Sequence, residues 1–176
     1  MLIITSTAVT RRARTARPLA GFARYPHREP GGAMTDFIDT RLWPIVQLHM
    51  PAQVDDASAD ERLAQFQAVH TRGERFVFLL DGEELPRHSP RFMSAYTQWT
   101  HENVELLRNC AGAIRIEPDP RQRGVHEEKA RIWNASDQAP YPFLVAASRE
   151  DALARARALL SAASDAAAGP RTEPNP

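Results

Sequence analysis

Three residues in one short stretch, Asp81, His88 and Ser89, have the types that a hydrolytic triad requires. A serine nucleophile needs a histidine within hydrogen-bonding reach, and that histidine needs a carboxylate to orient it. Side chains this close together in sequence rarely meet that geometry, and the sequence lacks the Gly-x-Ser-x-Gly turn of serine hydrolases. We therefore expect no catalytic residue here and predict that the chain is not an enzyme.

The other histidines do not predict a metal site. His101 and His126 each precede a glutamate, as in the first half of a zinc-binding His-Glu-x-x-His helix, but Glu105 and Ala130 occupy the positions of the second histidine. The glycines are too scattered to form a phosphate-binding loop. We therefore predict no metal and no cofactor, and we interpret both His-Glu segments as solvent-facing helix surfaces.

Polar residues near the expected strand ends suggest a binding rim instead. Ligands of open α/β sheets bind at the carboxyl ends of the strands, so a mixed set of acids and bases there could hold a ligand or a partner. The candidates are Asp81, Glu83, Arg87, His88, Arg121 and Arg123. Ser89 is a separate candidate, because serine followed by Pro90 is a common start of a helix.

These residues are positioned by apolar strands that alternate with amphipathic helices. The apolar patterns predict strands at about 37–38, 45–50, 76–80, 113–116 and 143–146, and helices from about 58 to 72, over 90–109, over 121–134 and from 149 onward. Such alternation is typical of βαβ units with right-handed crossovers. We predict one α/β domain with a mainly parallel four- to five-stranded sheet and about four helices, in the order β-β-α-β-α-β-α-β-α.

The helical periodicity also predicts which side chains are buried. For the second and third helices, the expected inward residues are Met93, Tyr96, Thr100, Val104 and Leu107, and Val125, Ile132 and Trp133. Cys110, at the end of the second helix, is expected to be buried and unreactive.

Composition restricts the classes of function. The single cysteine cannot form an internal disulfide, which fits a reducing compartment, and no apolar run is long enough to span a bilayer. We therefore expect a cytoplasmic protein without membrane insertion. Residues 34–164 hold fifteen basic and nineteen acidic residues, a net charge of −4, which does not favour nucleic-acid binding.

The two ends of the chain are expected to lie outside this domain. Residues 1–33 carry six arginines, one acid and several Pro and Gly residues, and residues 165–176 are also rich in turn formers, so we expect both to be disordered. The first segment has three interpretations: an organellar transit peptide, a twin-arginine signal that lacks its apolar region, or an extension upstream of a true start at Met34. The last is favoured.

The order of elements resembles that of the STAS and SpoIIAA-like superfamily, as a small stand-alone bacterial member. The resemblance spans about residues 35–163 and rests on the lead-in Arg41-Leu42-Trp43-Pro44 and on the strand that ends at Asp81. In signalling members a serine in an Asp-Ser-Ser-Gly turn after this strand caps the next helix and is phosphorylated. Ser89 occupies the matching position here without that surrounding motif, so the resemblance implies either a helix cap or a phosphosite.

Two functions remain open after these exclusions. The first is a non-catalytic regulatory module that docks a protein partner, which is what the resemblance implies. The second is a small-molecule binding protein, with an apolar or anionic ligand held between the sheet edge and the second helix. The sequence favours the first.

Overall fold

The computed structural model of the protein describes residues 37–82, 87–88 and 90–168. The chain divides into two compact units, Met1–Thr35 and Asp36–Pro176, and the first of these lies outside the described residues. The expected extension over residues 1–33 therefore lies outside them as well.

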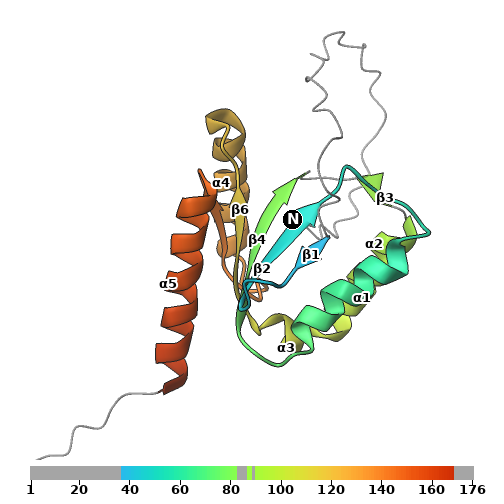
Figure 1. The fold of residues 1–176 in the computed structure, drawn as a ribbon, viewed down its shortest axis with the longest axis horizontal. Coiled ribbons are helices and arrows are strands. Elements are labelled where there is room, and N and C mark those ends of the chain that lie inside the picture. The colour runs from blue at the N-terminus through green and yellow to red at the C-terminus, as the bar shows by residue number, and fades with distance from the viewer. Residues whose placement is uncertain (1–36, 83–86, 89, 169–176) are drawn as a thin grey trace, which may run out of the picture. The chain divides into compact units, whose positions relative to one another are not determined.

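One five-stranded sheet organises the second unit, and it confirms the predicted α/β class (Figure 1). The strands are β1 (Ile38–Asp39), β2 (Ile45–Met50), β4 (Phe76–Gly82), β6 (Cys110–Ile116) and β7 (Phe143–Ala146), in the spatial order β1-β2-β4-β6-β7. β1 pairs with β2 in antiparallel fashion, and every other pair is parallel. Each parallel pair needs a crossover connection, which the helices supply.

A second, two-stranded parallel sheet was not predicted from the sequence. It joins β3 (Gln53–Val54) to β5 (Arg87–His88). Both strands have only two residues, too few for an alternating pattern to be recognised. The side chains of Arg87 and His88 are not among those that the structure describes.

The described residues form five helices, one more than expected, and the first four lie between strands. They are α1 (Ala59–His70), α2 (Pro90–Glu102), α3 (Val104–Leu107), α4 (Pro120–Asn134) and α5 (Arg149–Ala168). The helix predicted over 90–109 is interrupted at Asn103, whose φ of −123° and ψ of 37° leave the helical region and whose side-chain amide donates to Trp99 O at 2.9 Å. The last helix continues to Ala168, beyond the expected domain end at residue 164.

The break at Asn103 also explains an error in the predicted core. Thr100 and Leu107 are buried and Met93 and Tyr96 are partly buried, as expected, but Val104 is exposed. A single continuous helix would place Val104 on the inner face with Thr100 and Leu107. Because α3 restarts after a non-helical residue, its first residue faces outward instead.

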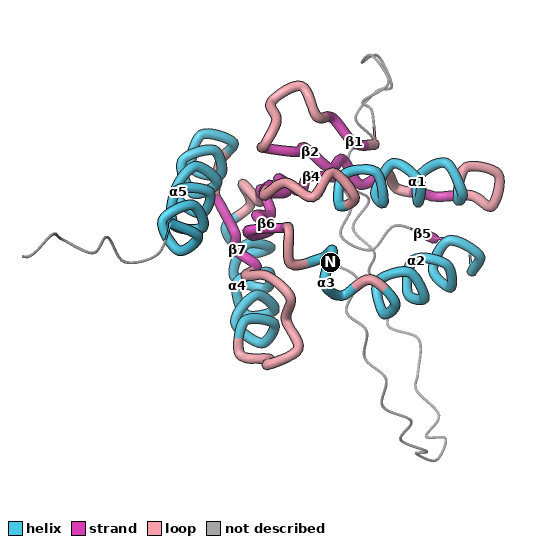
Figure 2. The backbone as a smooth tube through the Cα atoms, turned by 90° about the horizontal axis from the view of Figure 1, so that it is seen from below, coloured by secondary structure: helices cyan, strands magenta, loops and turns pink. Residues whose placement is uncertain are grey.

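α5 alone covers one face of the sheet with aliphatic contacts. Figure 2 shows β7 passing between α5 and α4, which lie on opposite faces. Ala152 and Ala156 of α5 are completely buried against Val77, Leu79 and Ile114. The same helix buries Ala156 and packs Leu153, Leu159 and Leu160 against this core.

α1 and α2 cover the other face with an aromatic cluster. Its members are Phe66, His70, Phe76, Phe78, Tyr96 and Trp99, with neighbouring ring centroids 4.4–5.8 Å apart. His70 is fully buried in it, with Nδ1 3.0 Å from Phe66 O and with Nε2 lacking any hydrogen-bond partner. Burial lowers the pKa of His70 to about 4, because a charged imidazolium would be desolvated there.

The inward face of α4 differs from the predicted one. Val125 and Ile132 are exposed, and the residues buried against the sheet are His126 and Ala130, with Trp133 partly buried. His126 was expected on a solvent-facing surface, so that expectation is wrong. The helix is oriented by contacts near β7, including a 2.8 Å hydrogen bond from the indole of Trp133 to Tyr141 O, rather than by its most apolar residues.

Asn134 satisfies the backbone at the outer edge of β7. Its side-chain Nδ2 donates to Phe143 O, and its Oδ1 accepts from Phe143 N, both at 2.8 Å. An edge strand otherwise presents such groups to solvent or to another chain. Asn134, the last residue of α4, therefore makes two of the hydrogen bonds to β7 that a sixth strand would make.

Cys110 is buried, as predicted, and burial raises the pKa of its thiol to about 12. A thiol that stays protonated is a poor nucleophile. No helix in the described part of the chain is long and apolar enough to cross a membrane.

We predict that Asn134→Ala lowers the free energy of unfolding by roughly 1–3 kcal/mol, because two backbone groups at the edge of β7 lose their partner. Urea denaturation checks this result. Gln122→Ala, on the exposed surface of the same helix, is the matched control and should change stability by less than about 0.5 kcal/mol. Equal stabilities for the two variants would contradict this role of Asn134.

We also predict that His70 makes folding sensitive to acid. The unfolded chain binds a proton at this imidazole below a pKa of about 6.5, whereas the folded protein does so only near 4. The free energy of unfolding is therefore unaffected by this proton above pH 6.5. It decreases as the pH falls from 6.5 toward 4, by roughly 3 kcal/mol at most. Urea titrations at several pH values give the free energy of unfolding as a function of pH. Over this window it should depend less steeply on pH in His70→Phe than in the wild type, whereas His101→Phe, at an exposed site, should keep the wild-type pH dependence.

Candidate functional site

The carboxyl ends of β2, β4, β6 and β7 lie at one edge of the sheet, and both α4 and α5 begin there. This is the edge at which open α/β sheets bind ligands. Polar side chains lie on both faces of the sheet at this edge. We call the group on the α5 face the ledge; it consists of Gln47, His49, Asp81 and Arg149.

The ledge is a chain of three short hydrogen bonds. Nδ1 of His49 lies 2.6 Å from Oδ1 of Asp81, and Nε2 of Gln47 donates to the other carboxylate oxygen at 2.7 Å. Nη1 of Arg149 donates to Oε1 of Gln47 at 2.6 Å. Each side chain therefore holds the next one in position, from the start of α5 across β2 to β4.

Strand alternation and register bring these residues together. Gln47 and His49 are two residues apart on β2, so they point to the same face. The register pairs His49 directly with Asp81, and Gln47 with Leu79 on the same face. Gln47 thus reaches Asp81 diagonally, which is within range for a long side chain.

The hydrogen-bonding partners fix the tautomer of His49. A carboxylate can only accept hydrogen bonds, so Nδ1 of His49 must carry the hydrogen that it shares with Asp81. In neutral His49, Nε2 then carries the lone pair, and no hydrogen bond joins it to another described residue. The His49 and Asp81 side chains are 36% and 30% exposed, so the pair is partly open to solvent.

An ion pair on β1 lies next to the ledge. Asp39 is the antiparallel partner of Gln47 and accepts hydrogen bonds from Nε and Nη2 of Arg41, the latter at 2.6 Å. These bonds lower the pKa of Asp39 to about 2. Asp39 is therefore ionised but already neutralised by Arg41.

A second polar group is buried on the opposite face, where α4 packs. Nη2 of Arg115 donates to Gly82 O at 2.8 Å, and Arg115 and His126 both lie near the Glu117 carboxylate, at 3.9 and 3.5 Å. Nε of Arg115 is buried and has no hydrogen-bond partner among the described residues. The group connects the end of β4 to α4 and has little access to solvent, so we interpret it as structural.

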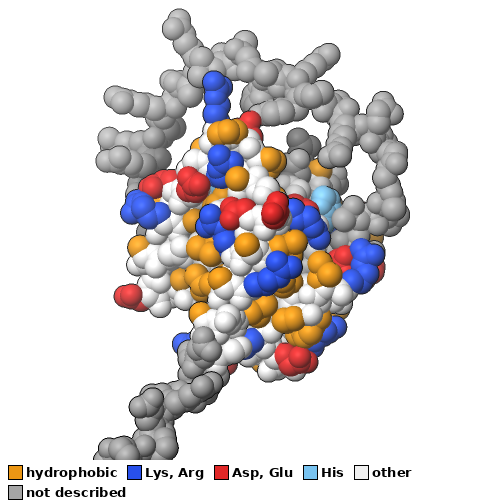
Figure 3. All heavy atoms as spheres, turned by 60° about the vertical axis from the view of Figure 1, so that its left-hand side comes forward, with side chains coloured by type: hydrophobic (Ala, Val, Ile, Leu, Met, Phe, Trp, Pro, Cys, Tyr) orange, Lys and Arg blue, Asp and Glu red, His pale blue; other side chains and the backbone are white. Residues whose placement is uncertain are grey.

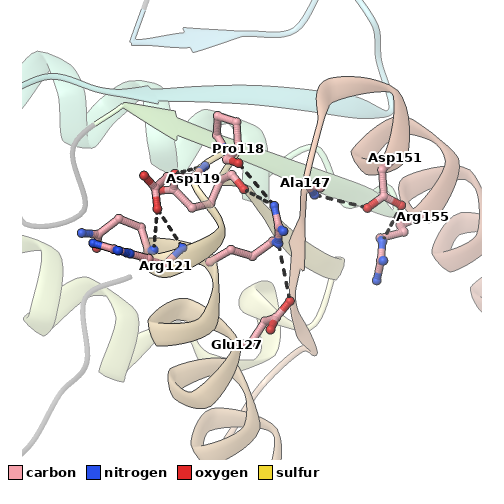
Figure 4. Close-up of polar contacts among 10 residues, drawn as sticks. Pro118, Asp119, Arg121, Glu127, Ala147, Asp151 and Arg155 are labelled. Carbon is pink, nitrogen blue, oxygen red and sulfur yellow. Dashed lines mark hydrogen bonds and ion pairs between the residues drawn. The ribbon is translucent and has the colours of Figure 1, made fainter.

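The amino terminus of α4 is fixed by Asp119 (Figure 4). Its Oδ1 accepts from the backbone N–H groups of Arg121 and Gln122, at 2.7 and 3.1 Å, and these bonds lower the pKa of Asp119. Nη1 of Arg123 lies 3.3 Å from Glu117 O, and its Nε lies 3.9 Å from Glu127. The guanidinium of Arg121 points away from these contacts into solvent.

The amino terminus of α5 lies close by. Ser148 Oγ accepts from Asp151 N at 3.2 Å, so this serine caps the helix that was expected from residue 149 onward. Asp151 in turn accepts from Ala147 N and from Nε of Arg155, as Figure 4 shows. The pKa of Asp151 is lowered mainly by Arg155 and in smaller part by the charge of Arg123 on α4.

The structure brings together only part of the predicted rim. Asp81, Arg121 and Arg123 lie at the expected edge, but Asp81 is bonded to Gln47 and His49 rather than to either arginine. Arg87 and His88 form β5, in the smaller sheet. Glu83 and Ser89, including the predicted cap or phosphosite, lie outside the described residues.

The sequence contained a signal for the ledge that our prediction missed. In Ile-Val-Gln-Leu-His-Met, Gln47 and His49 alternate with apolar residues, so one face of an otherwise apolar strand turns polar toward its carboxyl end. That pattern indicates a strand whose last residues are not covered by a helix. Arg149 could not be found this way, because its contact with Gln47 joins residues 102 positions apart.

No group of three or more His, Cys, Asp or Glu residues that could hold a metal occurs within the described ranges. Comparison with protein-family models, with curated proteins and with solved structures finds no match to this chain. The function is therefore argued from the geometry of the site.

We predict that neutral His49 carries its hydrogen on Nδ1 in the folded protein. The chemical shifts of the two ring nitrogens, measured through their couplings to the ring protons, report the tautomer directly. Asp81→Leu should release the hydrogen to Nε2, whereas Asp137→Leu, at an exposed position away from the ledge, should leave the shifts unchanged. A wild-type imidazole with its hydrogen on Nε2 would disprove the orientation derived above.

Proposed function

We propose that the chain is a regulatory protein-interaction module, as its resemblance to STAS and SpoIIAA-like domains implies, and that it docks its partner on the outward face of α4. The observation that carries the proposal is the pair Val125 and Ile132. These β-branched side chains are 50% and 59% exposed on one face of a 15-residue helix. Burial of exposed apolar side chains is a main source of docking energy.

The exposed pair belongs to a continuous stripe. Residues seven positions apart lie on nearly the same side of an α-helix, and Arg121 and Glu128 fall on that side as well. All four are exposed. We call Arg121, Val125, Glu128 and Ile132 the α4 stripe.

The charges of the α4 stripe indicate the chemistry of the partner. Glu128 is paired with Arg131 through hydrogen bonds of 2.7 and 2.8 Å, so its charge is compensated within the helix. No ion pair of Arg121 with an acid occurs within the described ranges, and Asp119, two residues before it, caps the backbone of the helix. A partner with an apolar side chain beside a carboxylate would complement this surface.

The surrounding surface supports docking of a protein rather than of nucleic acid. Figure 3 shows hydrophobic side chains interspersed with both acidic and basic ones on the side of the domain where α5 lies in Figure 1, and α4 itself carries Arg123, Glu127 and Arg131 in addition to the stripe. Mixed charge around apolar groups is typical of the rim of protein interfaces. Nucleic-acid binding would need a predominance of Lys and Arg.

The test is affinity capture with the full chain and two pairs of matched variants. Ile132→Asp and Arg121→Glu alter the α4 stripe, whereas Leu42→Asp and Arg157→Glu make the same chemical changes at exposed positions elsewhere. We predict that the wild type and both control variants retain a common partner and that both stripe variants lose it, with unchanged circular dichroism. A partner bound equally by all five proteins, or by none, would refute docking on α4.

A further inference from the structure

The ledge has a second feature that protein docking on α4 does not use: two polar groups that remain available after the internal hydrogen bonds are made. Nε2 of His49 is an acceptor without a partner among the described residues. Arg149 is exposed and donates through Nη1 to Gln47, which leaves its other N–H groups available. One end of the ledge therefore offers an acceptor and the other a cationic donor.

The ledge is also open to a ligand because of where α5 lies. α5 packs mainly over β4, β6 and β7; of β2, Ile45 lies in the core that α5 covers, whereas Gln47 and His49 are only partly buried. Gln47 and His49 lie on the α5 face of β2, and Arg149, in the first turn of α5, bonds to Gln47. His49 and Asp81 are only partly exposed, so a molecule on this face contacts them from one side.

The hydrogen bonds make this arrangement specific. Asp81 and Gln47 immobilise the imidazole and the guanidinium before any ligand arrives, so their ordering entropy is not lost on binding. Local charge does not attract anions indiscriminately, because Asp39, whose pKa is lowered by both Arg41 and Arg149, offsets part of their positive charge. A ligand must therefore make both contacts at once in order to bind appreciably.

We propose that the ledge binds a small hydroxylated anion, whose anionic group contacts Arg149 and whose hydroxyl donates to Nε2 of His49. Arg149 is bonded to Gln47, and the Cα atoms of Gln47 and His49 are about 6.6 Å apart along β2, so the ligand must be a few atoms long to span from Arg149 to His49. This is the span of a phosphorylated or carboxylated polyol of a few carbons. The site differs from the one expected from sequence, which lay between the sheet edge and the second helix.

The test uses glycerol 3-phosphate as the probe, with inorganic phosphate, glycerol and glycerate as comparators, titrated into the full chain and followed by NMR. We expect saturable shifts of the His49 ring and the Arg149 side-chain signals with glycerol 3-phosphate. Inorganic phosphate and glycerol, which make one contact each, should bind at least about tenfold more weakly. Glycerate tests which anionic group the site prefers. If glycerate binds as tightly as glycerol 3-phosphate, the site accepts carboxylates as well as phosphate esters; if it binds more weakly, the site prefers phosphate esters.

Matched variants make the inference falsifiable. His49→Phe and Arg149→Gln should each weaken glycerol 3-phosphate binding about tenfold or more, which is the effect of losing one hydrogen bond to a charged or oriented group. His101→Phe and Arg157→Gln, at exposed positions on α2 and α5, should stay within about twofold of the wild type. The proposal is overturned if neither glycerol 3-phosphate nor glycerate binds saturably, if phosphate alone binds as tightly, or if the ledge variants bind like the wild type. None of these results depends on the α4 stripe, so failure here leaves the docking proposal intact, and the reverse also holds.

Discussion

Two-sided burial of β4 is the constraint on which the other elements depend. Phe76, Val77, Phe78 and Leu79 are each at most 2% exposed, because β4 is hydrogen-bonded to β2 and β6 along its edges and covered by helices on both faces. Such a strand has no tolerance for a shift of register, since a one-residue slip would exchange its aromatic and aliphatic faces. The same register places Asp81 opposite His49. The ledge is therefore a consequence of how the core is aligned.

The two faces of the sheet are built for different packing distances. On the α5 face, Ala152 and Ala156 are small, and a Cβ added to Gly112 would lie 2.6 Å from Leu159 Cδ1, so the helix approaches the strands closely. On the opposite face, rings fill the space between β4 and the α1–α2 pair. If α5 and the α1–α2 pair exchanged faces, the small residues would leave voids and the rings would overlap with the strands. Both voids and overlaps are costly in a densely packed interior. The side-chain volumes thus specify which helices lie on which face.

The sequence predicted the elements that are defined by long local patterns. β2, β4, β7, α1 and α5 were expected from runs of apolar residues or from helical stripes, and the structure confirms them. The errors occur where non-local contacts decide the outcome. Val125 and Ile132 were expected to be buried, but α4 is oriented by Trp133 and Asn134, which bond to the backbone that leads into and begins β7. A periodic pattern describes one helix by itself and carries no information about such contacts.

The candidate site shows the same division between local and non-local information. The edge of the sheet was predictable, because parallel strands with right-handed crossovers place their carboxyl ends together. Which residues meet there depends on register and on the position of α5, and neither can be read from composition. His88 and Ser89 were the focus of the sequence argument, whereas the histidine that bonds to Asp81 is His49, 32 residues away.

The position of α5 also explains why polar residues are tolerated on β2. Gln47 and His49 share a face with Ile45, which packs in the aliphatic core that α5 covers. If α5 lay one strand closer to β1, it would bury the Asp81 carboxylate and the Arg149 guanidinium, and burial of such charges costs more than their mutual attraction returns unless every group is paired. Displacement of α5 toward β7 keeps the aliphatic core intact and leaves the polar end of β2 partly solvated. The packing of α5 and the accessibility of the ledge therefore both depend on where α5 lies over the sheet. A change to the small residues of α5 would alter both.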